Sequence, residues 1–231
     1  MVSTIKRASL LGLMSVVAVA GANGQIAPGD KTVLLPPAPA PVLAAADQQV
    51  RTIYPLIRFD LPTNAVAIRV KRLTAGSTTP VLLTPTDIPI ASVLKVTMDR
   101  TYYVFPDNTL TALGSYSYSV AAVLDDGRVG TSSWIAFSPQ VYEPQNVTAQ
   151  KLSPYSVAVV FTSSVFPARA YRVYGTGIAP FGMQAATTDK MGRSWAVQLS
   201  NLAAGTYNFV VRAEFDPGIR SNGVPVSVTL P

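Results

Sequence analysis

Hydrophobic and polar residues alternate in short runs through most of the chain, and a period of two is typical of β-strands with one buried face. The alternation is clearest where Tyr207, Phe209, Val211 and Ala213 share one face while the residues between them point away. Gly, Pro, Asn and Asp separate the runs, as they do at turns. No run beyond the N-terminal region has the length and period of an amphipathic helix. The chain is therefore predicted to be all-β.

The predicted strands form two successive sets. The first set covers residues 51–60, 67–73, 101–105, 115–124 and 133–138. The second set covers residues 147–150, 156–162, 170–175, 195–199, 206–215 and 224–230. Strands of this length and spacing indicate two β-sandwiches in series.

The two sets are also related in sequence, which indicates a tandem repeat. The clearest match is between residues 205–213 and residues 114–122. Aligning residues 100–104 with residues 193–197 gives a second match. This alignment predicts that Tyr102 occupies a core position and leaves Tyr103 pointing outward.

The first unit is longer than the second because it carries an insertion within residues 74–98. The inserted residues are apolar and rich in proline, and they are expected to add an edge strand or a protruding loop. Its candidate residues for binding a partner are Leu82, Leu83 and Ile88.

The N-terminal region differs from the rest of the chain. Within residues 1–24, a basic pair precedes an apolar stretch that is typical of an export signal and too short to span a bilayer comfortably. Two interpretations of this segment are open: a signal that is cleaved, and an N-terminal arm that is retained. The expected organisation beyond it is a proline-rich spacer over residues 25–45, a first sandwich over 46–140 and a second sandwich over 141–231.

Several segments of the second unit carry a recognisable pattern, namely residues 144–149, 157–161, 171–174, 202–207 and 211–213, with Ser221 before the last strand. This pattern resembles the fibronectin type III family, or more broadly an immunoglobulin-like sandwich. The resemblance covers nearly all of residues 144–231, and residues 46–139 match more loosely. It implies that Tyr116 and Tyr207 occupy the tyrosine corner, where a hydroxyl ties a crossover to a strand.

The composition excludes several kinds of chemistry. The chain has neither Cys nor His, which excludes disulfides, thiolate nucleophiles and a Ser-His-Asp triad, and removes the usual zinc ligands. The net charge of +6 is spread along the chain, whereas a nucleic-acid binder gathers its basic residues on one face. We therefore expect no enzyme activity, no cofactor, no metal and no nucleic-acid partner.

Two short polar segments are interpreted as turns. Asp125, Asp126 and Gly127 contain the only adjacent pair of carboxylates, but a calcium site needs about six to eight oxygen ligands and no acidic repeat surrounds them. A hairpin turn is predicted instead, because Asp-Gly favours the positive φ that such turns require. Asn222 and Gly223 are interpreted in the same way.

Two further groups are candidates for contact with a partner. Tyr103 and Trp134 are aromatic residues of the kind that anchor interfaces. The apolar loop over residues 178–183 is expected either to contact a partner or to pack on the edge of its own sandwich. The candidate residues of this loop are Pro180, Phe181 and Met183.

These observations favour a non-catalytic structural or binding protein displayed on an extracellular, appendage or virion surface. It would act through protein–protein contacts of its two sandwiches, with other proteins or with copies of itself. A secreted carbohydrate-binding accessory protein with a surface glycan as ligand is one alternative, and a periplasmic two-domain assembly chaperone is another. The expected location is extracytoplasmic or in a virion, with membrane contact only through the leader if it is retained.

Overall fold

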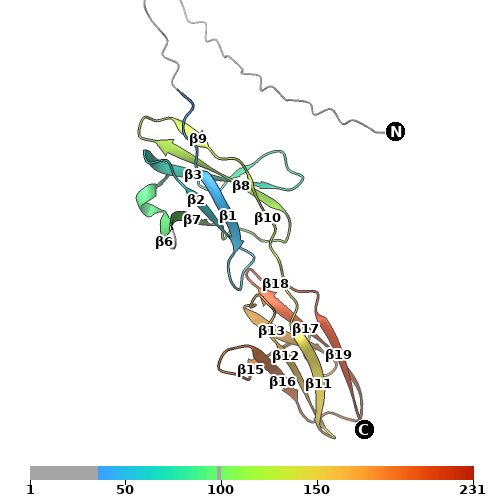
Figure 1. Ribbon diagram of the computed structural model, residues 1–231. Helices are drawn as coiled ribbons and strands as arrows, with labels where there is room; N and C mark the ends of the chain where they lie inside the picture. The colour runs from blue at the N-terminus through green and yellow to red at the C-terminus, as the bar shows by residue number, and fades with distance from the viewer. Residues whose placement is uncertain (1–35, 98–99) are drawn as a thin grey trace, which may run out of the picture. The chain divides into compact units, whose positions relative to one another are not determined.

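The structure is a computed structural model that describes residues 36–97 and 100–231. The leader over residues 1–24 and most of the spacer lie outside the described residues. The described chain folds into β-strands and one short 3-10 helix, η1 (Ile90–Ser92) (Figure 1). No helix within this part is long and apolar enough to cross a membrane. The all-β prediction is confirmed.

The first sandwich is built from two antiparallel sheets. One sheet has the strand order β1-β2-β7-β6, and the other has the order β10-β8-β3-β4, with β5 beside β3 and β9 beside β8. The strands are β1 (Val42–Gln48), β2 (Pro55–Asp60), β3 (Ala65–Thr74), β4 (Val81–Leu82), β5 (Ile88–Pro89), β6 (Leu94–Thr97), β7 (Thr101–Pro106), β8 (Tyr116–Leu124), β9 (Val129–Thr131) and β10 (Ile135–Phe137).

The second sandwich repeats this connectivity. One sheet has the order β11-β12-β16-β15, and the other has the order β14-β13-β17-β18, with β19 also beside β17. The strands are β11 (Gln145–Ser153), β12 (Ser156–Thr162), β13 (Ala170–Gly175), β14 (Met183–Gln184), β15 (Ala186–Thr187), β16 (Ser194–Leu199), β17 (Gly205–Phe215), β18 (Ile219–Arg220) and β19 (Val224–Leu230). The order of the long strands confirms two sandwiches in series.

The inward faces follow the period of two in the sequence. In β17 the buried residues are Tyr207, Phe209, Val211, Ala213 and Phe215, and the residues between them are more exposed. Burying a large apolar side chain contributes about 1.5–3 kcal/mol. Packing of such residues from both sheets therefore stabilises each sandwich.

The predicted tyrosine corner is present in both sandwiches. The hydroxyl of Tyr116 donates a hydrogen bond of 2.9 Å to the carbonyl of Ala112. The hydroxyl of Tyr207 donates one of 2.8 Å to the carbonyl of Ala203. Each tyrosine thus fixes the crossover that leads into its own strand.

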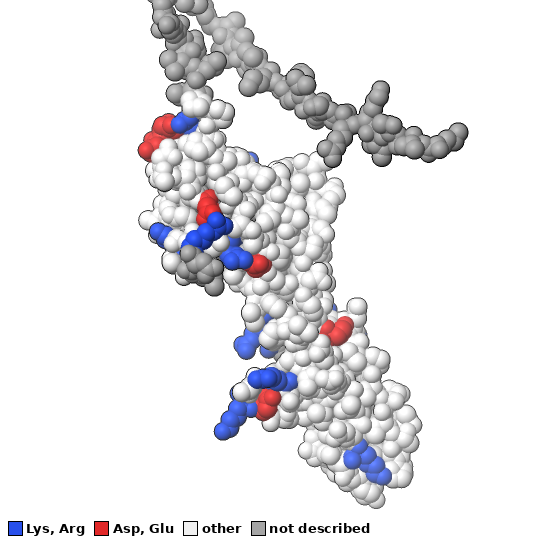
Figure 2. Space-filling model, in the orientation of Figure 1, with Lys and Arg blue, Asp and Glu red and all other residues white. Residues whose placement is uncertain are grey.

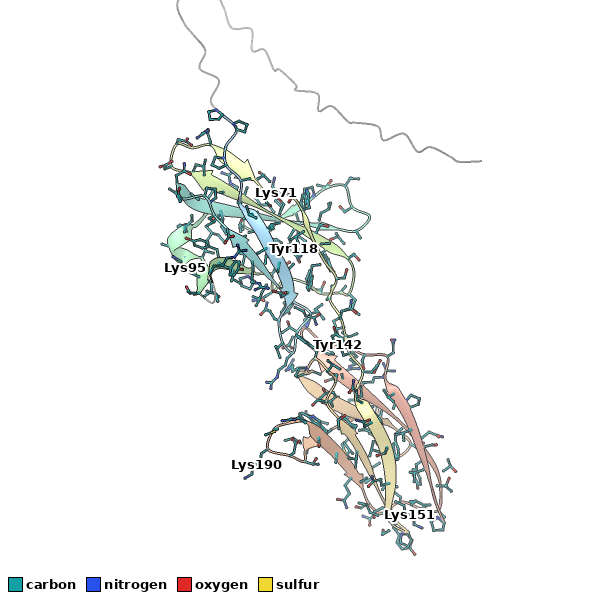
Figure 3. The ribbon with its side chains drawn as sticks, in the orientation of Figure 1. Lys71, Lys95, Tyr118, Tyr142, Lys151 and Lys190 are labelled. Atoms are coloured by element: carbon teal, nitrogen blue, oxygen red, sulfur yellow. The ribbon has the colours of Figure 1, made fainter. Side chains whose placement is uncertain are left out.

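A buried ion pair lies in the first sandwich. Asp107 is 1% exposed, and its Oδ2 lies 2.6 Å from the guanidinium of Arg72. Its Oδ1 accepts hydrogen bonds from the backbone N–H and the hydroxyl of Thr109. The hydroxyl of Tyr118, which Figure 3 labels, donates a further bond to Oδ2. Burial alone would raise the pKa of Asp107, but the hydrogen bonds from Thr109, Tyr118 and Arg72 outweigh it and hold that pKa below its usual value.

The second sandwich has no charge at the corresponding place. Arg72 faces Tyr118 across β3 and β8, and the equivalent pair across β13 and β17 is Gly175 and Phe209. A Cβ on Gly175 would lie 2.1 Å from the carbonyl oxygen of Asn208. The space that the ion pair fills in one sandwich is thus closed by backbone and a ring in the other.

Several strand boundaries differ from the prediction, and the two largest differences lie at the start of the first sandwich. β1 begins at Val42, within the range 25–45 that was assigned to the proline-rich spacer. β2 begins at Pro55 rather than at residue 51, because residues 49–52 form a turn in which Arg51 has a φ of 68°. A residue with positive φ ends a strand.

The turn prediction is confirmed for Gly127 and wrong for Gly223. Gly127 joins β8 to β9 with a φ of 81°, and its N–H donates to the carbonyl of Leu124. The turn between β17 and β18 is instead at residues 216–218, where Gly218 has a φ of 102°. Gly223 lies in a break between β18 and β19, both of which pair with β17. Asn-Gly is therefore a sign of positive φ here, and not of a hairpin.

A serine fills this break in both sandwiches. Ser221 donates its N–H to the carbonyl of Ala213, and its Oγ accepts the N–H of the same residue at 3.1 Å. Ser132, between β9 and β10, makes the same two bonds with Val120. The serine hydroxyl thus replaces a backbone carbonyl of the ladder.

Candidate functional site

The candidate residues of the insertion lie on or near β4, at one edge of the first sandwich. Val81 and Leu82 form this two-residue strand and are 52% and 44% exposed. Leu83 and Ile88 are only partly exposed and pack against the core. Of the three predicted residues, Leu82 therefore faces outward and the other two have a structural role.

The element that the insertion adds is β5, which pairs with β3 alongside β4 at the edge of its sheet. The last part of the range 74–98 forms β6, which pairs with β7, but β15 pairs with β16 in the same way, so this edge is common to both sandwiches. Of the two alternatives for the insertion, the edge strand is thus the one observed, and β5 forms it.

The loop over residues 178–183 lies at the corresponding edge of the second sandwich. It leads into β14, which pairs with β13 as β4 pairs with β3. Phe181 is 72% exposed and Met183 is 41% exposed, and Pro180 is exposed as well. Ile178 packs against the core. The loop therefore packs through one end and leaves its other apolar residues free of the sandwich.

Backbone contacts hold this loop with Phe181 outward. Gly182 has a φ of 74°, and its N–H donates a hydrogen bond of 2.8 Å to the carbonyl of Ala179. A Cβ at Gly182 would lie 2.6 Å from the ring of Tyr174. The guanidinium of Arg172 also lies 3.4 Å from the Phe181 carbonyl oxygen. The exposure of Phe181 is thus built into the local structure.

Tyr103 points inward, contrary to the prediction. Its ring stacks on Phe59 with a centroid distance of 6.2 Å and an interplanar angle of 20°. Tyr102 is the outward residue, and its ring lies between the guanidinium groups of Arg58 and Arg100 at 5.7 and 4.6 Å.

The alignment behind this prediction was shifted by one residue. Tyr103 faces Phe59 across β7 and β2, as Trp195 faces Phe161 across β16 and β12. Because successive residues of a strand point to opposite faces, a shift of one residue exchanges the inward and outward positions. The equivalent of Trp195 is therefore Tyr103.

Trp134 is the exposed member of the predicted aromatic pair. It lies just before β10 and is 46% exposed. Tyr103 is partly buried and packs against the core of its sandwich, so these two residues do not form a joint surface.

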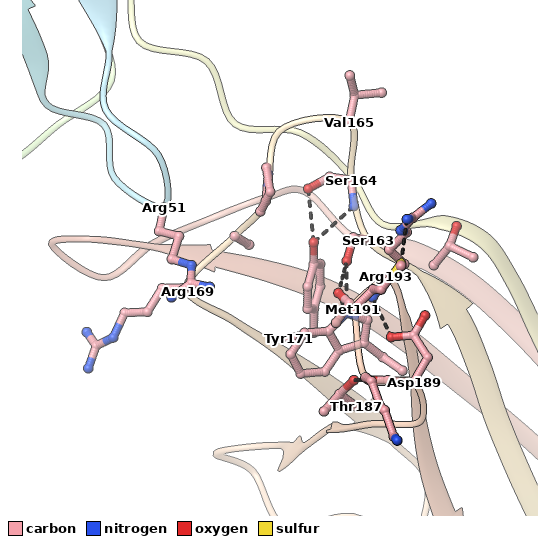
Figure 4. A pocket seen from close by; sticks show the side chains of 16 residues that line it. Arg51, Ser163, Ser164, Val165, Arg169, Tyr171, Thr187, Asp189, Met191 and Arg193 are labelled. Carbon is pink, nitrogen blue, oxygen red and sulfur yellow. Dashed lines mark hydrogen bonds between the residues drawn. The ribbon is translucent and has the colours of Figure 1, made fainter.

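A cavity of about 810 Å³ opens at one end of the second sandwich, between the loops over residues 163–169 and 188–193 (Figure 4). We call it the loop cavity. Its floor is formed by Tyr171 and Trp195, whose ring centroids are 5.1 Å apart. The Tyr171 hydroxyl accepts a hydrogen bond of 2.9 Å from the Ser164 N–H, and Trp195 Nε1 donates one of 2.9 Å to Ser163 Oγ. Trp195 Nε1 also donates to the carbonyl of Gly192 at 3.0 Å, so both walls are tied to an aromatic floor.

Basic side chains prevail around the loop cavity. Among its lining residues in the second sandwich, Arg169, Lys190 and Arg193 are basic and Asp189 alone is acidic. Figure 2 shows blue side chains gathered at this end of the second sandwich with little red between them. Lys190 projects from its loop in Figure 3. The electrostatic potential of the cavity is therefore positive.

The single acidic residue makes its hydrogen bonds to backbone N–H groups and, in the described part of the chain, forms no ion pair with the cations beside it. The carboxylate of Asp189 accepts the backbone N–H groups of Arg193 at 2.7 Å and Ser194 at 3.2 Å. Burial raises the pKa of Asp189, but these backbone hydrogen bonds outweigh burial and hold it below its usual value. Within the described residues, no ion pair joins Lys190 or Arg193 to a carboxylate.

The loop cavity was not among the sites predicted from the sequence. Its only sequence signal is a pair of basic residues, Lys190 and Arg193, in one short loop. Nothing in the spacing indicates that the loop over 163–169 lies opposite. Across the described ranges there is also no group of three acidic residues that could hold a metal ion.

No protein-family model and no curated protein matches the sequence. Solved structures do match. A two-domain fibronectin type III segment of chicken tenascin is 16% identical, with 81% of this chain and 98% of that chain covered and a TM-score of 0.35. Fibronectin(III)-like modules of Clostridium thermocellum CbhA are 13% identical, with 82% and 93% covered and a TM-score of 0.27. The FN1–FN3 domains of chicken CNTN1 are 16% identical, with 84% and 68% covered and a TM-score of 0.32.

The connectivity of the two sheets and the tyrosine corner identify the fold without reference to these scores. Both sandwiches are fibronectin type III-like. A fibronectin type III-like scaffold hosts many functions, so its function has to be argued from its sites. Two sites emerge here, namely the apolar edges at β4 and β14 and the loop cavity.

Proposed function

We propose that this is a non-catalytic structural or binding protein that acts through protein–protein contacts at β4 and β14. The observation that carries this proposal is a repeated one. The same edge of each sandwich has a two-residue strand with exposed apolar side chains, Val81 and Leu82 in one and Met183 in the other.

The chemistry of these edges supports a contact with protein. An edge strand presents unpaired backbone N–H and C=O groups, and proteins usually protect such edges with charged residues. The two edges carry apolar side chains instead, and Phe181 adds a large ring beside β14. A partner strand that pairs with the backbone would also cover these side chains.

The edges are tested by placing a charge on each. In the variant Leu82→Lys with Met183→Lys, the complex recovered by cross-linking from the native source is expected to be lost. The matched control is Leu152→Lys, because Leu152 is an exposed leucine on β11. Equal cross-linking by the edge variant and the control would contradict the proposal, and so would turnover of a glycan or peptide by the purified protein.

We further propose a location outside the cytoplasm, on a cell surface or appendage, or in a virion. The support is the signal-like composition of residues 1–24. The N-terminal sequence and intact mass of the protein from its native source test this point. A start at Asn23 or Gln25 would indicate export through a signal peptidase, whereas a start at Met1 or Val2 would favour an assembly component that keeps its arm.

A further inference from the structure

The loop cavity has the size and the walls of a built binding site. A volume of about 810 Å³ lies within the range of about 300–1,000 Å³ that is typical of ligand sites. Its walls are fixed, because hydrogen bonds tie Ser163 and Ser164 to the aromatic floor and Thr187 Oγ1 to the Asp189 carbonyl at 2.7 Å. A ligand would thus meet surfaces that are already in place.

The charge of the cavity favours an anionic ligand. Lys190 and Arg193 have no carboxylate partner within the described residues, and Asp189 is occupied by backbone N–H groups. Arg169 already pairs with Asp216 at 2.6 Å, so it contributes less. Two cations therefore remain free to pair with negative groups of a ligand.

The apolar part of the cavity narrows the class of ligand. Val165 and Met191 are largely exposed, and both line the cavity together with Pro167. A sulfated glycan or a free anion would leave these side chains uncovered. An extended protein segment that alternates acidic and apolar residues would cover them and pair with the cations at the same time.

We propose that the loop cavity binds an acidic, partly apolar segment of a protein partner. Lys190 and Arg193 pair with carboxylates of the segment, and Val165 and Met191 pack on its apolar side chains. None of the residues that line the cavity belongs to β4 or β14. This site can therefore be tested independently of the proposed edge contacts.

Trp195 makes the proposal directly measurable. The chain has two tryptophans, and Trp195 forms part of the cavity floor. In full-length protein with Trp134→Phe, all tryptophan fluorescence comes from Trp195. The probe is a synthetic end-blocked peptide of alternating glutamate and leucine, and the reference peptide has glutamine in place of glutamate. The glutamate peptide is expected to change the fluorescence in a saturable way that weakens as salt is added, and the glutamine peptide is not.

Variants separate the two parts of the site. Lys190→Glu with Arg193→Glu is expected to weaken binding of the glutamate peptide at least tenfold. The control Lys71→Glu with Lys151→Glu makes the same change in net charge at exposed positions outside the cavity and is expected to stay within twofold. Val165→Ser is expected to weaken binding about threefold to fivefold through lost apolar contact.

Calorimetry on the wild-type chain is the second readout, because it detects binding even when the fluorescence of Trp195 does not change. Absence of heat and of a fluorescence change with the glutamate peptide overturns the proposal. The proposal is also overturned if heparin or sodium sulfate binds as tightly as the peptide and Val165→Ser has no effect, because the site would then recognise charge alone. Equal affinity of the charge-reversed variant and its control would overturn it as well.

Discussion

The hydroxyl of Tyr118 donates a hydrogen bond of 2.8 Å to Oδ2 of Asp107, and the same oxygen lies 2.6 Å from the guanidinium of Arg72. A carboxylate that is 1% exposed and has three different side chains as donors is a central support of its sandwich. The second sandwich has Phe209 in place of Tyr118, so it is stabilised without such a buried carboxylate.

Removing this charge should destabilise the first sandwich. Asp107→Asn leaves Arg72 partly buried without a counter-ion, and breaking a buried pair in this way costs about 3 kcal/mol in the free energy of unfolding. Urea denaturation measures the change when it is followed by the fluorescence of Trp134 in proteins that all carry Trp195→Phe, because the chain has two tryptophans. Asp126→Asn is the control, because the Asp126–Arg128 pair lies in an exposed turn and its loss should change stability far less. Equal losses in the two variants would show that the buried network has no special role.

The contribution of Asp107 should depend on pH in a defined direction. Burial raises its pKa, but the hydrogen bonds outweigh burial, so the pKa in the folded state is lower than the unfolded value of about 3.9. A lowered pKa stabilises the folded state above the unfolded pKa, and this stabilisation is lost as the pH falls through the folded pKa. The stability difference between wild type and Asp107→Asn should therefore be largest near neutral pH and shrink below about pH 4. A difference that stays constant from about pH 7 to about pH 2.5 in urea denaturation would contradict this assignment.

The two tyrosine corners should contribute equally and independently. Tyr116→Phe and Tyr207→Phe each remove one hydrogen bond to a carbonyl, which costs about 1 kcal/mol. Because the two tyrosines lie in different sandwiches, the losses in the double variant should add. Thermal denaturation of the three variants, with the exposed Tyr155→Phe as control, measures this. A strongly non-additive double variant would be inconsistent with separate structural roles.

Two adjacent tyrosines should differ sharply in their effect on stability. Tyr103→Ala removes the ring stacked on Phe59 and should cost about 2–3 kcal/mol. Tyr102→Ala removes a ring between two arginines on the outer face and should cost less than about 1 kcal/mol. Chemical denaturation of both variants decides between the observed register and the one expected from the alignment. The reverse order of losses would support the alignment.

Gly223 should tolerate a side chain less well than Gly218. Both residues have a φ near 100°, so an alanine at either position costs about 1 kcal/mol in backbone strain. A Cβ at Gly223 would also lie 2.4 Å from Cγ1 of Val210, whereas nothing lies within 4 Å of a Cβ at Gly218. Gly223→Ala should therefore lower the midpoint of thermal unfolding further than Gly218→Ala. Equal midpoints would mean that Val210 moves aside at no cost.

The sequence predicts the long strands well because their signal is local. The predicted range 170–175 coincides with β13, and the range 156–162 coincides with β12. β1 was not predicted because its run of alanines shows no alternation of apolar and polar residues and follows directly on prolines. Alternation reports which strands exist, and it says less about where each one begins.

Features that depend on contacts between residues far apart in the chain could not be predicted from the sequence. The orientation of Tyr103 depends on its pairing with Phe59 in another strand, and a one-residue error in alignment reversed it. The loop cavity depends on two loops that are separated by β13, β14 and β15. The exposed Leu82, Phe181 and Met183 were predicted individually, but only the strand order shows that β4 and β14 occupy equivalent edges.

The serine-filled breaks have a consequence for misassembly. Neighbouring domains of similar sequence are prone to exchange strands with each other or with another molecule, and long regular edges favour such errors. Ser132 divides one such edge into two strands of three residues, and Pro225 removes a donor from β19 beyond the break at Ser221. An intruding strand would find no continuous ladder to extend along β9 and β10. The same residues that make this edge irregular thereby disfavour strand exchange there.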